Sequence, residues 1–146
     1  SPINKLLEFN WKSATYIFIF YNSILVILII HLKYTMPNIN YRDMNILKMS
    51  LYLFLLTITE GVTEELIWRG YIIKELENSG YSKNRSIIYS AISFSLIHGI
   101  FFPVKLFLTF ILGIVAGIYF TKERNLVPLI FSHWFVDLWS FGIYFF

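Results

Sequence analysis

Long apolar segments constrain this chain more than any other feature of its sequence. The segment from Ala14 to Leu32 contains no Asp, Glu, Lys or Arg. An α-helix of about 20 such residues crosses the hydrocarbon core of a bilayer. Four further segments of similar character follow, at about Asn45 to Ile73, Ser86 to Phe102, Lys105 to Phe120 and Pro128 to Phe146. Because a helix satisfies its own backbone hydrogen bonds in lipid, the expected fold class is all-α, a polytopic membrane bundle with about five transmembrane helices.

The composition supports an integral membrane protein with a single domain. The chain has 146 residues, of which 57% are hydrophobic and only 14% are charged. Its mean hydropathy is +0.63, and the charged share is well below that of an ordinary soluble domain. Five helices and their loops leave no room for a separate soluble domain, so residues 1–146 are expected to form one intramembrane domain.

Charge and cysteine content narrow the partners and the chemistry. The chain has no cysteine, which excludes disulfides, thiolate metal sites and cysteine nucleophiles. Its net charge of +3 is spread over loops, which favours the lipid bilayer as a partner and no nucleic acid. The N-terminus and the second and fourth loops, which lie on one side of the predicted membrane topology, hold seven Lys and Arg residues. The first and third loops, on the other side, hold four. Because positive residues favour the cytoplasmic side, the N-terminus is expected to be cytoplasmic. The abundance of Ile, Asn, Lys, Tyr and Phe is compatible with an AT-rich genome and a bacterial cell membrane.

Glu64, Glu65 and Arg69 place three charges in the middle of the second apolar segment. Ionisable side chains are costly in hydrocarbon, so such a cluster usually faces the protein interior and marks a functional site. Glu65 and Arg69 are i and i+4 with the acid first, which is the favourable order for an ion pair on one helix face. Glu64 projects about 100° away from Glu65 around the helix, so its partners are expected from other segments.

Three ionisable residues of other segments share the depth of Glu64. His98 lies in the third apolar segment, and His133 and Asp137 are i and i+4 in the fifth. At about 1.5 Å per helical residue, the four residues fall within a band roughly 8 Å deep, counted from loops on one side of the membrane. A common depth is what a shared intramembrane site requires, and we therefore predict that Glu64, His98, His133 and Asp137 form one site.

Three motifs in order connect these residues to a known family. Residues 64–69 (EELIWR) match Glu-Glu-x-x-x-Arg, residues 94–98 (FSLIH) match Phe-x-x-x-His, and residues 133–137 (HWFVD) match His-x-x-x-Asn/Asp. Gly113 and Gly117 lie between the second and third motifs and are expected to let helices pack closely. The chain resembles the CAAX-protease and bacteriocin-processing (CPBP) family of intramembrane glutamic endopeptidases, which includes the type II CAAX prenyl endopeptidases. The resemblance covers residues 60 to about 140.

The resemblance implies a role for each motif residue and implies neither a metal nor a cofactor. Glu64 and His98 would hold and deprotonate a water, and His133 with the last motif residue would stabilise the oxyanion. The last residue is Asp137, where the commoner pattern has Asn, and an ionised carboxylate cannot donate a hydrogen bond. We therefore expect Asp137 to orient His133 unless it is held protonated. Glu65, Arg69 and Phe94 are expected to support the site structurally.

Other functions are compatible with the same residues. Glu64, His98 and His133 are also a possible ligand set for a zinc hydrolase, although the HExxH spacing is missing. The polar residues could instead tie helices together in a non-catalytic immunity or scaffold protein, or serve a proton or ion carrier. The expected substrate of a protease is a membrane-associated peptide or protein, such as a bacteriocin leader, a signalling peptide or a CAAX-like C-terminus. The sequence indicates no oligomeric state.

Overall fold

The computed structural model describes residues 10–35 and 46–145, and over these residues every regular element is a helix. The all-α class predicted from the sequence is confirmed for this part of the chain. The elements are α2 (Trp11–Thr35), α3 (Ile46–Glu65), the π-helix η1 (Leu66–Ile73), α4 (Lys74–Asn78), α5 (Lys83–Gly99), α6 (Pro103–Glu123) and α7 (Val127–Phe145).

Two of the described helices are long and apolar enough to cross a membrane. One is the continuous helix Ile46–Asn78, formed by α3, η1 and α4, and the other is α6, with 33 and 21 residues respectively. Of the predicted five or so transmembrane helices, these two have the length and hydropathy to span a membrane, and the transmembrane bundle itself stays a prediction. The continuous helix Ile46–Asn78 extends beyond the end at Ile73 that the sequence predicted and reaches Asn78, and Glu77 in its last turn pairs with Arg124 at 2.8 Å.

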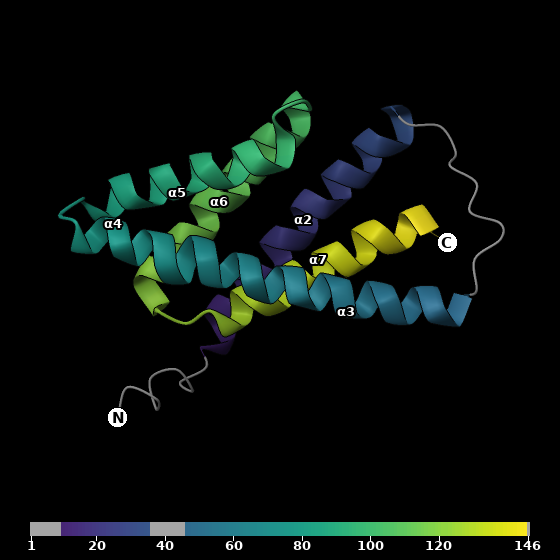
Figure 1. Cartoon of the computed structure of the whole chain (residues 1–146), viewed down its shortest axis with the longest axis horizontal. Helices are drawn as coiled ribbons and strands as arrows, with labels where there is room; N and C mark the ends of the chain where they lie inside the picture. Colours follow the sequence, from purple (N-terminus) through teal and green to yellow (C-terminus); the bar gives the residue numbers. More distant parts are fainter. Residues whose placement is uncertain (1–9, 36–45, 146) are drawn as a thin grey trace.

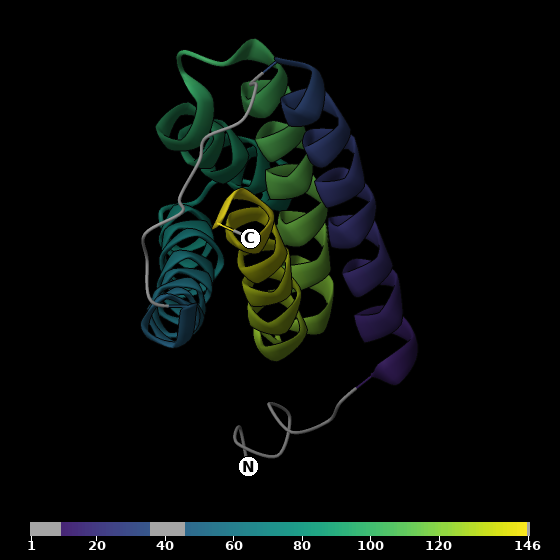
Figure 2. The ribbon, with the colours of Figure 1, turned by 90° about the vertical axis from the view of Figure 1, so that its right-hand side faces the viewer.

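Helix α7 lies at the centre of the arrangement. It contacts α3 on one side and α2 on the other, while α5 and α6 pack against each other as a pair (Figures 1 and 2). A Cβ atom added at Gly113 of α6 would lie 2.9 Å from Ala91 of α5, and one added at Gly117 would lie 2.9 Å from Ile87. The prediction that this glycine pair serves close helix packing is confirmed.

A π-helical segment follows Glu65 directly. In a π-helix each N–H bonds to the carbonyl five residues before it, and such segments occur frequently at functional sites. The hydroxyl of Ser90 on α5 donates a hydrogen bond of 2.8 Å to the carbonyl oxygen of Trp68. Trp68 and Arg69 are both buried against the neighbouring helices. Trp68 and Arg69 thus point into the bundle, and the Ser90 hydrogen bond joins η1 to α5.

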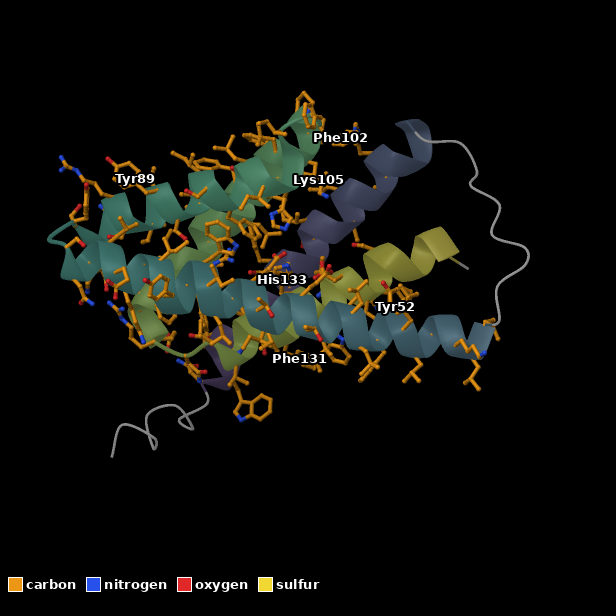
Figure 3. All side chains as sticks on the ribbon, viewed as in Figure 1. Tyr52, Tyr89, Phe102, Lys105, Phe131 and His133 are labelled. Atoms are coloured by element: carbon orange, nitrogen blue, oxygen red, sulfur yellow. The ribbon has the colours of Figure 1, made fainter. Side chains whose placement is uncertain are left out.

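The core is apolar and much of the exterior is also apolar. Buried residues of α2, α6 and α7 form the main hydrophobic cluster, which includes Ile17, Tyr21, Ala116, Phe120 and Leu129. Large hydrophobic side chains are exposed on all the longer helices, and Figure 3 labels three of them, Tyr52, Tyr89 and Phe131, and also the exposed Phe102 just before α6. An extensive apolar exterior of this kind suits contact with lipid.

Candidate active site

Glu64 and His98 meet between the end of α3 and the end of α5. His98 Nε2 lies 3.2 Å from Glu64 Oε1. The other ring nitrogen, Nδ1–H, donates to the carbonyl oxygen of Phe94 at 2.8 Å. Because Nδ1 is committed as a donor, the contact at Nε2 needs one proton, shared between the imidazole and the carboxyl group. The two side chains thus form a pair that can hold and release a proton.

His133 of α7 faces the other carboxylate oxygen of Glu64. Its Nε2 lies 3.5 Å from Glu64 Oε2 and also 3.5 Å from Asp137 Oδ2. Figure 3 shows His133 near the middle of the molecule, where α3 and α7 run close together. The close approach depends on Gly61 of α3, where an added Cβ would lie 3.1 Å from the backbone nitrogen of Trp134. The structure therefore brings the four ionisable residues predicted from depth into one cluster.

Glu65 is the second carboxylate of the cluster and is completely buried. Its Oε1 accepts hydrogen bonds from three donors, at 3.2 Å from Arg69 Nη1, 2.8 Å from His133 Nδ1–H and 3.3 Å from the Tyr21 hydroxyl. The i,i+4 ion pair between Glu65 and Arg69 predicted from the sequence is present. Its contact with His133 was not predicted, and it is the shortest of the three. Glu65 hydrogen-bonds to Nδ1 of His133, while Asp137, which the sequence predicted to orient this ring, lies 3.5 Å from Nε2.

Phe94 packs against several groups of the cluster. Its ring centroid lies 4.4 Å from that of His98 and 6.1 Å from that of His133. The guanidinium carbon of Arg69 lies 4.5 Å from the same ring, within cation–π range. Phe94 thus packs against the His98 ring and against the Arg69 guanidinium.

The two carboxylates differ sharply in exposure. The side chains of Glu64, His98 and Asp137 are 25%, 21% and 21% exposed, whereas Glu65 is 0% and Arg69 1% exposed. One side of the cluster is therefore accessible to water or a ligand, and the other is sealed inside the bundle. Glu60, one turn before Glu64, is half-buried near the accessible side.

Tyr21 and Ser90 take part in this arrangement but were not predicted from the sequence. Tyr21 belongs to α2 and reaches Glu65, and Ser90 holds the π-helix that carries Arg69. Neither residue lies in one of the three motifs. Each makes its contact through a single hydroxyl to a residue far away in the chain, so no local pattern marks it. No group of three or more His, Asp and Glu side chains within residues 10–35 and 46–145 has an arrangement suited to a metal ion.

A comparison with family models decides the affiliation of the chain. Residues 46–139 match the model described as type II CAAX prenyl endopeptidase Rce1-like. The chain belongs to this family. The Rce1-like match contains Glu64, His98, His133 and Asp137, and it confirms the resemblance drawn from the motifs. Membership makes the chain a membrane protein and a CAAX-type intramembrane protease. Neither a search of curated proteins nor a search of solved structures finds a match to it.

Proposed function

We propose that this protein is a glutamic-type intramembrane endopeptidase that hydrolyses a peptide bond with a water activated by Glu64 and His98. The observation that carries the proposal is the 3.2 Å contact between His98 Nε2 and Glu64 Oε1, beside a second histidine and on the accessible side of the cluster. A carboxylate within hydrogen-bond reach of a bound water can act as its general base. Glu64 Oε2 is a buried atom that makes no hydrogen bond within the described residues and lies 3.5 Å from His133 Nε2, so it keeps the capacity to accept a proton.

In the first step Glu64 accepts a proton from water while the water oxygen bonds to the scissile carbonyl carbon. The electron pair of the C=O bond moves to the carbonyl oxygen. His98 positions the carboxyl group, and its own ring is fixed by Phe94 through the 2.8 Å hydrogen bond at Nδ1. In the second step the carbonyl re-forms, the C–N bond breaks and the leaving nitrogen takes the proton from Glu64. One water is consumed, one carboxylic acid and one amine are produced, and Glu64 returns to its carboxylate form.

His133 is the group that we assign to the oxyanion. Its Nδ1–H is bound to Glu65, so a proton on Nε2 points towards the space beside Glu64 and Asp137. A donor aimed at developing negative charge stabilises the transition state, and its effect is large in a site that excludes bulk water. Asp137 faces the same nitrogen at 3.5 Å and is assigned to holding the charge of that ring. Glu65, Arg69 and Phe94 support the arrangement from the buried side.

The proposed substrate is a membrane-associated peptide or protein. The family name points to a prenylated CAAX-like C-terminus, and a bacteriocin leader or a signalling peptide fits the same site. We further infer that α2, α5 and α7 also span the membrane, that the N-terminus is cytoplasmic, and that the host membrane is bacterial. In this arrangement the accessible side of Glu64 and His98 lies within the bilayer, where a lipid-anchored segment can reach it.

The test is cleavage by the purified protein in liposomes, with products identified by mass spectrometry. The probes are a peptide with a farnesylated CaaX terminus and a set of unmodified hydrophobic peptides. We expect wild-type protein to release fragments and Glu64→Gln to lose activity by several orders of magnitude, since the amide cannot accept a proton. Glu75→Gln, an exposed residue of α4, is the matched control and should keep the wild-type rate. Near-normal turnover in Glu64→Gln would remove Glu64 from the mechanism.

A further inference from the structure

Tyr21 reaches the candidate site from a helix that the family match does not include. The match begins at residue 46, and Tyr21 lies in the middle of α2. Its side chain is only 1% exposed, and its hydroxyl donates to Glu65 Oε1 at 3.3 Å. Its ring centroid lies 6.0 Å from that of His133. Tyr21 therefore contacts both partners of the hydrogen bond that orients the His133 ring.

The hydroxyl of Tyr21 acts on a single oxygen atom. Glu65 Oε1 is the acceptor for Tyr21, for Arg69 and for His133 Nδ1–H. The three donors come from α2, η1 and α7, so this oxygen joins three helices. Because Glu65 is fully buried, water does not compete for these positions, and hydrogen bonds to a charged group are the stronger ones. The location of Oε1 sets the direction in which Nε2 of His133 faces Glu64 and Asp137.

We propose that Tyr21 is a positioning residue for His133, acting through Glu65. Its hydroxyl holds Oε1 in place, and Oε1 in turn holds Nδ1–H of the imidazole. The inference rests on the proposed function for its effect on rate, because there Nε2 of His133 stabilises the oxyanion. A role in packing alone would need only the ring, which lies in the same buried cluster as Ile17 and Ile24. The hydroxyl and the ring can therefore be tested separately.

Tyr21→Phe keeps the ring and removes the hydroxyl. On the farnesylated CaaX peptide in liposomes we expect kcat to fall about tenfold, as for the loss of one hydrogen bond to a charged group, with KM changed by less than about twofold. The melting temperature in detergent should fall by only a few degrees, as for the loss of one buried hydrogen bond in a chain of this size. Tyr16→Phe is the matched control, since Tyr16 lies on the same helix, is 64% exposed, and should show wild-type kinetics.

A second measurement does not depend on turnover. In protein labelled at histidine nitrogens, the Nδ1–H resonance of His133, assigned by its loss in His133→Gln, should move in Tyr21→Phe and stay in place in Tyr16→Phe. An unchanged resonance, or an unchanged kcat, would overturn the proposal. So would a loss of activity that merely follows a lower melting temperature. Should Glu64→Gln remain active, the proposed function fails, and the resonance still decides whether Tyr21 positions His133.

Discussion

The two adjacent glutamates, Glu64 and Glu65, occupy opposite halves of the site. Glu64 meets His98 on a side where both are about one-fifth to one-quarter exposed, whereas Glu65 is sealed among Arg69, Tyr21 and His133. A change of one position along the helix thus separates an accessible carboxylate from a buried one. Under the proposed function, proton transfer and positioning would be divided between these neighbouring residues, and His133 contacts both of them.

The accessible half is tested most strongly by His98→Gln. If His98 Nε2 works with Glu64 on the water, removing the imidazole should lower kcat by about 10²–10⁴, the range of general acid–base catalysis. The melting temperature should change little, because the His98 side chain is partly exposed. Kinetics on the farnesylated CaaX peptide and thermal unfolding in detergent measure both quantities. A rate within a fewfold of that of wild type would show that His98 takes no part in the chemical step.

The buried half is tested by comparing two glutamates that each pair with an arginine. Glu65→Gln leaves Arg69 as an uncompensated buried charge, which should reduce the free energy of unfolding by about 3–5 kcal/mol. Glu77→Gln breaks the pair with Arg124, whose side chain is 40% exposed, and should cost about 0–1 kcal/mol. Denaturant unfolding in detergent compares the two variants. If Glu65→Gln lost activity while its stability stayed at the wild-type value, Glu65 would act in the chemical step and not only in support of the fold.

Asp137 lies between the halves and is expected to have a smaller effect. Because Glu65 already holds Nδ1 of His133, Asp137→Asn should leave the ring in place and lower kcat by about tenfold or less through loss of one charge near Nε2. A pH–rate profile of both forms is the measurement. A higher rate for Asp137→Asn on the alkaline side would show that this residue donates to the oxyanion, because the amide is a permanent donor.

Metal removal should have the smallest effect on either half. The proposed mechanism uses only side chains and water, so prolonged treatment with a strong chelator is expected to leave kcat unchanged, and elemental analysis should find no stoichiometric zinc. If the chelator abolished activity and added zinc restored it, Glu64, His98 and His133 would be zinc ligands, and the separate roles assigned to the two glutamates would be wrong.

The sequence alone determined the features that depend on spacing along one helix. Apolar segments with few charges predicted the helices, and the i,i+4 interval predicted the pair of Glu65 and Arg69. The common depth of Glu64, His98, His133 and Asp137 predicted that they meet, and their motifs predicted the family. Each of these features follows from the rise per residue of a helix or from the type of residue, and both can be worked out from the sequence of one segment.

Only the tertiary structure decided which side of each helix faces which neighbour. Helices α3 and α7 approach closely at Gly61, and Ser90 of α5 bonds to the carbonyl of Trp68 in η1, beside the buried Arg69. These contacts join residues far apart in the chain, so no local pattern predicts them. For the same reason the sequence did not reveal that Tyr21 reaches Glu65, or that Glu65 is the hydrogen-bond partner of His133.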